Sequence, residues 1–257
     1  MPYIPYTTQY VIGWRNVFYG GTLTASSEPD GGEPENAVDG FTSDYWAPVA
    51  GASPAEAWIA VDCGSTTAVD YLAIAAHNLG TIGAEVTLEG SADGSSWTTV
   101  TGPHAVADDT PAMWIFVSVS YRHYRLVIAG DAISLGVLQA GARLTLPEGV
   151  FVGYEPERLN RQNDTMNQLT EGGQFIGRSI IRTSVKGEIN QPRANQAWVR
   201  GAWTLFRDHA ELRPFFIMWR SDDYPDEVAY CWSTDDAAVK QRSNGFMDVS
   251  MKFAGLV

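Results

Sequence analysis

The first half of the chain is built from short runs in which apolar and polar residues alternate. Clusters of Gly, Asp and Pro separate these runs at residues 28–32, 91–94 and 129–131. Short runs with such punctuation predict an all-β sandwich, because each run matches a half-buried strand and each cluster a turn. We predict strands at residues 58–62, 69–75, 84–89, 96–100, 112–119 and 121–128.

The second half has longer polar side chains and larger apolar blocks, which predict a β-sheet packed against one helix. We expect the helix at residues 195–212, with Asn195 as its N-cap and Pro214 as its stop. The apolar stripe of this helix consists of Trp198, Ala202, Leu205 and His209. Strands are predicted at residues 174–186, 215–220, 227–233 and 246–253, with a turn at 221–226.

Charge supports a division of the chain into two domains. The 257 residues carry a net charge of −13. Up to Pro147, four arginines and no lysine stand against 15 acidic residues, which gives −11. After Pro147, 13 basic residues stand against 15 acidic ones, which gives −2. We therefore predict a β-sandwich domain at residues 1–147 and an α+β domain, a β-sandwich with one helix, at residues 148–257.

Several classes of partner and location are excluded by the composition. The acidic first half disfavours binding to nucleic acid or to an anionic membrane. No apolar run approaches the ~18 residues that a membrane-spanning helix requires. The opening residues, MPYIPYTTQY, have neither the basic nor the apolar region of a secretory signal. Two cysteines are too few for a disulfide framework.

Four blocks of the first half follow one another in a familiar order. They are ASS (25–27) with PENAVDG (34–40) and YW (45–46), WIAVDCG (58–64), EGSADGSSW (89–97) and YRHYRL (121–126). Together these blocks resemble the coagulation-factor type C domain, also called the discoidin-like or galactose-binding-like domain, over roughly residues 10 to 145. The resemblance implies an eight-stranded jelly roll with ligand loops at one end. Members of this family commonly bind sugars, and some bind lipid or protein.

The same resemblance suggests where a sugar would bind. Sugar binding needs an aromatic platform for the ring and planar polar groups for the hydroxyls. The candidates are Asp44, Tyr45 and Trp46 on one loop and His77 and Asn78 on another. Two other interpretations stay open. Trp46 matches a family position that is often in the core, and His77 with Asn78 has the composition of a residue pair that shapes a turn.

A structural calcium ion is a further implication of the family. It would be held by the loop around Asp39 and Gly40 and by a Glu near the end of the domain. Asp39 is present, but Val137 stands where that Glu is expected. Because Ca²⁺ takes six to eight oxygen ligands, the loss of one ligand weakens such a site. Calcium, with Asp39 as a ligand, is the one cofactor that we consider.

The chain carries no recognisable catalytic motif, and we predict that it is not an enzyme. None of its four histidines has metal-ligand spacing, and it contains no nucleophile elbow, P-loop or dinucleotide fingerprint. Cys63 and Cys231 are expected to be small buried residues. Glycosidases place two carboxylates in a cleft, but the acidic pairs of this chain lie in expected turns. These acidic residues are Asp222, Asp223, Asp226, Asp235 and Asp236.

The order of elements in the second half is similar to that of tail-tip ring proteins of long-tailed phages. Those proteins combine a tube-like β-sandwich with one helix and assemble into rings. The resemblance implies a virion protein of the tail tip or baseplate, whose partners are copies of itself, other tail proteins and host surface glycan. The polar segment at residues 160–173 would be a loop that orders only against a neighbour.

Two other functions remain open at this point. In the first, the chain is a free carbohydrate-binding, lectin-like protein. In the second, it is an accessory domain of a glycan hydrolase. Neither the ligand, nor the order of a ring, nor the neighbouring proteins follow from the sequence.

Overall fold

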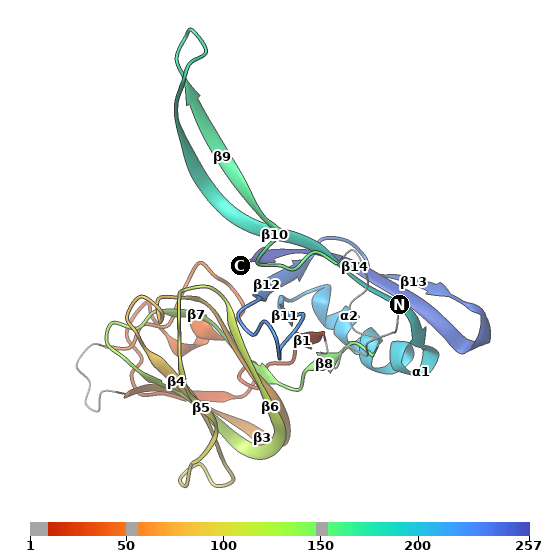
Figure 1. Cartoon of the computed structure of the whole chain (residues 1–257). Coiled ribbons are helices and arrows are strands. Elements are labelled where there is room, and N and C mark those ends of the chain that lie inside the picture. The colour runs from red at the N-terminus through yellow and green to blue at the C-terminus, as the bar shows by residue number, and fades with distance from the viewer. Residues whose placement is uncertain (1–9, 50–55, 148–153) are drawn as a thin grey trace.

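A computed structural model describes residues 10–49, 56–147 and 154–257, which form two antiparallel sheets (Figure 1). The first sheet has the order β2-β3-β6-β4-β5, and β7 pairs with β3. Its strands are β2 (Thr22–Ala25), β3 (Glu56–His77), β4 (Glu85–Ser91), β5 (Thr98–Ala105), β6 (Ala112–Ala129) and β7 (Leu135–Gly141). A short 3-10 helix, η1 (Pro34–Ala37), precedes the loop that leads to Trp46.

Two long strands turn this sheet into a sandwich. β3 and β6 pair along most of their length, with register shifts between Asp62 and Thr67 and between Val69 and Tyr71. The first part of β3 also pairs with β2, and its second part pairs with β7. Each long strand therefore contributes to both layers, and each joins two of the strands predicted from the sequence. With both parts counted, eight strand segments form the predicted jelly roll, and the mainly β fold class is confirmed.

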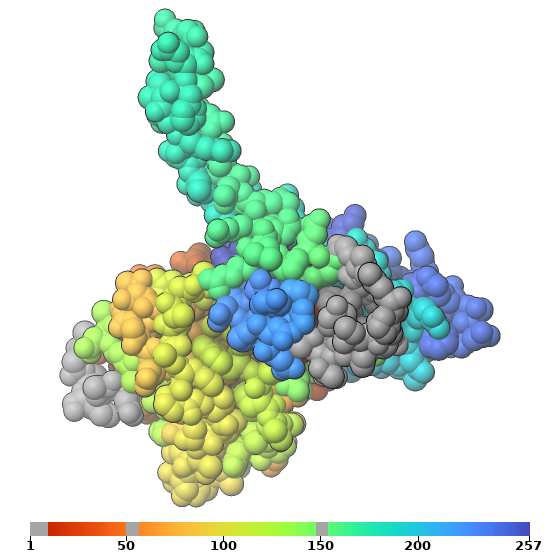
Figure 2. All heavy atoms as spheres, in the orientation of Figure 1, coloured from red at the N-terminus to blue at the C-terminus, as the bar shows by residue number. Residues whose placement is uncertain are grey.

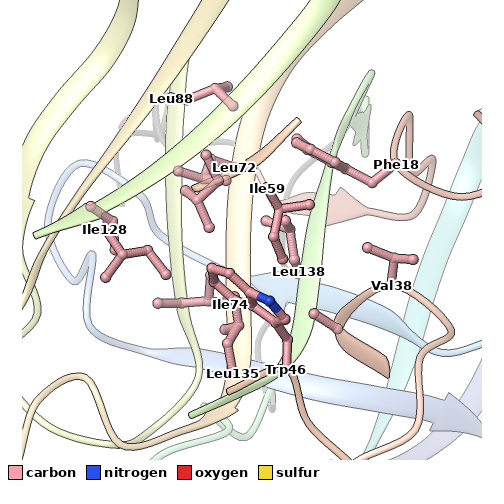
Figure 3. Packing of buried hydrophobic residues seen from close by; sticks show 14 of the residues in the cluster. Phe18, Val38, Trp46, Ile59, Leu72, Ile74, Leu88, Ile128, Leu135 and Leu138 are labelled. Carbon is pink, nitrogen blue, oxygen red and sulfur yellow. The ribbon is translucent and has the colours of Figure 1, made fainter. Parts of the chain in front are cut away.

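The core of the jelly roll is filled by large side chains from both layers (Figure 3). On β4 the period-two pattern is explicit, since Val86 and Leu88 are buried while Glu85 is exposed. Trp46 lies among Ile74, Leu135 and Leu138, with none of its surface accessible. Burial of each such side chain stabilises the fold by about 1.5–3 kcal/mol.

The second sheet has the order β8-β1-β11-β12-β14-β10-β9, and β13 pairs with β14. Its strands are β1 (Val11–Gly13), β8 (Leu144–Thr145), β9 (Arg161–Leu169), β10 (Phe175–Asn195), β11 (Phe215–Met218), β12 (Val228–Ser233), β13 (Ala238–Gln241) and β14 (Phe246–Leu256). A short 3-10 turn, η3 (Ser243–Gly245), precedes β14. The strands predicted in the second half are confirmed. β1 and β8 were not predicted, because runs of three and two residues carry no periodic signal.

One continuous helical segment packs on this sheet. It consists of α1 (Gln196–Trp198), the π-helical stretch η2 (Val199–Trp203) and α2 (Thr204–Ala210). The Asn195 side chain accepts a hydrogen bond from the backbone N–H of Ala197 at 2.8 Å, so the predicted N-cap is confirmed. None of the helices in the described residues is long and apolar enough to cross a lipid bilayer.

The predicted apolar stripe of the helix is wrong by one position. The buried residues are Val199, Trp203, Phe206 and Ala210, whereas Leu205 is 52% exposed. Two neighbouring stripes of this helix are largely apolar, and the one with Trp203 and Phe206 fills the core. The predicted stripe ends in His209, whose polar ring is more costly to bury than the methyl group of Ala210.

The two halves share an apolar layer. Tyr71, Met113 and Val137 of the jelly roll form one buried cluster with Phe216 and Val228 of the second sheet. β1 lies in the second sheet although it precedes the jelly roll in sequence, because it pairs with β11. The domain boundary expected at 147 and 148 adjoins residues 148–153, which lie outside the described residues, and it stays a prediction.

A two-stranded arm projects from the second sheet (Figures 1 and 2). From Val185 to Asn195, β10 pairs with β14. Before Val185, from Phe175 onward, β10 pairs with β9 alone. The expectation of a loop at residues 160–173 is therefore corrected, because β9 is a regular strand. The long partner strand supplies hydrogen bonds to this polar segment, which has no apolar periodicity of its own.

Candidate functional site

The two loops predicted to bind sugar meet at one end of the jelly roll. The backbone of Trp46 exchanges two hydrogen bonds with Leu135, at 2.9 and 3.0 Å. The Asn78 side chain donates to the carbonyl of Ala132 and accepts from the N–H of Ser134, both at 2.8 Å. Both loops thus border residues 132–135. The Asn78 amide is used to join two loops, which matches its interpretation as a turn-shaping residue.

Trp46 and His77 lie inside the protein. The indole N–H of Trp46 donates to the carbonyl of Ser27 at 3.1 Å, and the ring has no exposed surface. The His77 Nδ1 accepts from the N–H of Leu79 at 3.3 Å, and burial lowers the pKa of His77. An indole without exposed surface cannot stack on a sugar ring. Trp46 is therefore a core residue, and we do not include it or His77 in the candidate surface.

The side chains of residues 41–45 all reach the surface, and three of them carry an aromatic ring or a carboxylate. Tyr45 is 49% exposed and Asp44 is half-buried beside it. Phe41, which sequence reasoning missed, is 64% exposed on the same loop. The sequence signal that could have identified Phe41 is its position directly after the Asp39–Gly40 turn. The candidate carbohydrate surface, called the 41–45 loop below, therefore consists of Phe41, Asp44 and Tyr45.

The second half of the chain holds the base of this loop. The Tyr230 hydroxyl of β12 donates to the Gly40 carbonyl at 2.6 Å. Gly40 has φ +91°, a conformation that favours glycine, and an added Cβ would meet Pro214 and the Tyr230 hydroxyl at 3.3 Å. Asp39 accepts the N–H of Phe41 at 2.8 Å, while burial raises the pKa of Asp39. A residue of the second sheet thus fixes the turn from which the 41–45 loop starts.

The residues present do not fit the calcium site that the family resemblance implies. One oxygen of Asp39 is engaged by Phe41, and the Gly40 carbonyl is engaged by Tyr230. Val137, at the position of the expected Glu, is buried in β7. In the described parts of the chain, no three His, Cys, Asp or Glu side chains cluster as metal ligands would. The donor set falls short of the six to eight oxygens that Ca²⁺ requires.

The acidic pairs and the cysteines have no catalytic geometry in the described residues. Asp222, Asp223 and Asp226 lie in an exposed turn, where Asp223 pairs with Arg220. Asp235 and Asp236 are also exposed. Burial raises the pKa of both cysteine thiols, Cys63 and Cys231, which keeps them in the unreactive neutral form.

Comparison with known protein families identifies the first half. Residues 22–137 match the F5/8 type C domain family. This stretch is an F5/8 type C domain. It includes β2 to β6, the 41–45 loop and the start of β7. No curated protein matches the chain significantly.

Several solved structures are similar to about half of this chain. Chitosan-binding module 1 of a chitosanase/glucanase from Paenibacillus sp. IK-5 is 24% identical (TM-score 0.42; 50% of this chain, 99% of that chain). Module 2 of the same enzyme, in complex with chitotriose, is 23% identical (TM-score 0.42; 49% and 100%). CpGH89CBM32-5 from Clostridium perfringens, in complex with GalNAc-β-1,3-galactose, is 19% identical (TM-score 0.43; 50% and 100%).

Proposed function

We propose that the chain is a non-catalytic subunit of a larger assembly, in which copies of the chain associate through the β9–β10 arm. The observation that carries this proposal is the uncovered apolar surface of the arm. Six large apolar side chains on it are each 51–69% exposed. This arm patch consists of Met166, Leu169, Phe175, Ile176, Ile180 and Ile181.

The arm patch lies on both faces of the two-stranded ribbon. Ile180 stands opposite Thr165, and Met166 stands opposite Ser179, one position further along each strand. Because side chains alternate between faces, these two apolar residues point to opposite sides. A ribbon of two strands is marginally stable in water on its own, and a patch of this kind marks an interaction site. Covering both faces requires the arm to insert between neighbouring elements.

Charge favours a second copy of the chain as the neighbour. Residues 161–185 carry three arginines and two acidic residues, so the arm is slightly basic, whereas the first 147 residues carry −11. Within the arm, Arg182 pairs with Asp164 at 2.5 Å. Arg161 and Arg178 form no ion pair in the described residues. Contact with the acidic domain of another copy would provide carboxylates for them. A repeated head-to-tail contact of this kind forms a ring when its rotation closes.

The assembly that we propose is the tail tip or baseplate of a long-tailed phage. The second half would build the ring together with other tail proteins, and the F5/8 type C domain would project outward toward host surface glycan. The similarity in element order between the second half and tail-tip ring proteins supports this role. Detection of the chain in purified tail particles by mass spectrometry tests it, and consistent absence from such particles would exclude the virion role.

Analytical ultracentrifugation of the full chain over a wide concentration range tests the role of the arm. We expect oligomers for the wild type and monomers for the triple variant Phe175→Thr, Ile176→Thr, Ile180→Thr. Threonine keeps the preference for strand but removes the apolar surface. Val117→Thr, at an 86% exposed position of the jelly roll, is the matched control and should assemble like the wild type. A wild type that stays monomeric at every concentration contradicts the proposal.

A second candidate function is carbohydrate binding by the F5/8 type C domain, as a lectin-like protein or as an accessory domain of a glycan hydrolase. The specific observation in its favour is the exposure of Phe41 and Tyr45 beside the Asp44 carboxylate on one loop. Two aromatic rings provide a stacking surface, and a carboxylate accepts hydrogen bonds from hydroxyls. The similar structures named above include modules solved with chitotriose and with GalNAc-β-1,3-galactose.

A glycan array with the full chain tests this second function. The full chain is required because β1 and β8 pair within the second sheet. Tyr45→Ala and Phe41→Ala should each abolish binding, whereas Tyr224→Ala, at an equally exposed tyrosine of the other half, should not. Binding that survives both loop substitutions would place the sugar elsewhere. Polysaccharide degradation by a partner enzyme, measured with and without the chain, separates the accessory role from the lectin role.

A further inference from the structure

A cavity of about 390 Å³ lies where the two halves of the chain meet. Its volume falls in the range of small-molecule sites, roughly 300–1,000 Å³. Such sites favour the junction between domains, where neither part fills the space completely. The polar or aromatic residues on its wall are Arg15, Asn16, Tyr19, Asp39, Thr67 and Gln139 from the first half and His209, Arg213 and Tyr230 from the second.

Two arginines on this wall lack a carboxylate partner among the described residues. The Arg213 guanidinium stacks on the Tyr19 ring, 3.6 Å from its centroid, and Arg15 lies 4.7 Å from the centroid of Trp14. Eight other arginines of the same structure do form ion pairs with Asp or Glu. Two guanidinium groups on one cavity wall, neither of them paired with a carboxylate, are suited to bind an anion.

The remaining wall groups set the local charge and provide hydrogen bonds. The His209 ring contacts Trp14 edge-on, with centroids 5.3 Å apart. Burial and the nearby Arg213 charge lower the pKa of His209, so the positive charge of the cavity comes from the arginines alone. Gln139 donates its N–H to the Trp14 carbonyl at 2.8 Å, and its carbonyl oxygen is an acceptor. Asp39 adds a carboxylate.

We propose that this cavity binds a small carboxylated sugar, at a site distinct from the 41–45 loop and independent of the assembly through the arm. A ligand carboxylate suits the planar fork of Arg15 or Arg213, which can donate two parallel hydrogen bonds. Sugar hydroxyls donate to Asp39 and Gln139. The apolar C–H face of the ring packs against Val38 and Tyr19, which also line the cavity. An anion without a sugar ring would use only the arginines, and neither the hydroxyl acceptors nor the apolar surface.

Isothermal titration calorimetry of the full chain tests the proposal with glucuronic acid, galacturonic acid, the matching neutral sugars glucose and galactose, and inorganic sulfate. We expect saturable binding of a sugar acid, with the neutral sugars and sulfate at least tenfold weaker. Equal binding of sulfate would reduce the site to a general anion site and overturn the sugar assignment. Absence of binding by both sugar acids would overturn the proposal as a whole.

Variants connect the binding to the cavity. Arg213→Gln and Arg15→Gln should each weaken sugar-acid binding at least tenfold, whereas Arg200→Gln, an exposed arginine of the helical segment, should leave it unchanged. Unchanged binding in both cavity variants refutes this site. Thermal unfolding without ligand checks that the variants fold. If Arg213→Gln does not fold, Arg213→Lys keeps the charge but not the planar fork, and it should still weaken binding.

Discussion

Two long antiparallel strand pairs dominate this molecule, and their apolar side chains have opposite environments. β3 and β6 extend over 22 and 18 residues. β10 extends over 21 residues, and its first part, from Phe175 to Val185, pairs with the nine residues of β9. Near Gly64, which has φ +72°, β3 changes register against β6, and its two parts enter the two layers of the jelly roll. The β9–β10 ribbon has bulges but extends beyond the second sheet without doubling back. A ribbon that folds onto itself buries its own apolar face, whereas the β9–β10 ribbon leaves its apolar side chains exposed.

Replacement of an aromatic side chain in the core of the jelly roll should have the largest effect on stability. Trp46→Ala should reduce the free energy of unfolding by about 3–5 kcal/mol, because the indole is fully buried and its loss leaves a cavity. Denaturant unfolding of the purified variant measures this. A variant as stable as the wild type would mean that Trp46 does not pack in the core.

The second region contains a buried carboxyl whose titration should be visible in the stability of the protein. Glu157 is fully buried and accepts a hydrogen bond from the Tyr154 hydroxyl, while burial raises the pKa of Glu157 to about 8. The folded chain therefore keeps the proton up to about pH 8, whereas the unfolded chain releases it near pH 4.5. Since the folded state binds more protons in this window, stability should fall as pH rises from about 5 to 8.

Glu157→Gln should flatten this dependence. The slope that it removes is at most about 1.4 kcal/mol per pH unit. Thermal or denaturant unfolding at several pH values between 5 and 9 gives the slope for both proteins. The surface carboxylate Asp62 is the matched control, because Arg122 lowers the pKa of Asp62 to about 2, outside this window. Parallel slopes for wild type and Glu157→Gln would contradict the predicted proton uptake.

The contact between the two regions should be sensitive to a single oxygen atom. Tyr230→Phe removes the donor to the Gly40 carbonyl and should cost about 1 kcal/mol, the value of one buried hydrogen bond. If the second function is correct, the same variant should also weaken glycan binding at the 41–45 loop. Tyr224→Phe, at an exposed tyrosine, controls for the loss of a hydroxyl group. Equal stability of the two variants would show that Tyr230 does not hold the turn.

The smallest change is expected in the arm itself. Ile180→Thr should alter the stability of the monomer by no more than about 0.5 kcal/mol, because the side chain is 60% exposed and lies in no buried cluster. Unfolding is measured below the concentration at which the wild type associates. A loss comparable to that of Trp46→Ala would mean that the arm is packed within its own chain.

Sequence patterns predicted most of the strands, the Asn195 cap and the F5/8 type C resemblance, because each depends on residues close together in the chain. The choice of helix face was wrong because two adjacent stripes are apolar, and only the packing of Trp203 and Phe206 distinguishes them. Of the predicted sugar residues, Asp44 and Tyr45 are accessible, but Trp46 and His77 are buried. A loop sequence does not reveal which of its neighbouring aromatics turns inward.

The sequence by itself determined a mainly β chain with an F5/8 type C domain in its first half, since alternation and turn residues act locally. Tertiary structure decided three other features. It placed β1 in the second sheet, brought Tyr230 to Gly40, and left the β9–β10 arm without cover. The physical reason is that burial depends on which surfaces meet after folding. A strand pattern is the same whether its apolar side chains face the core, another domain or another molecule.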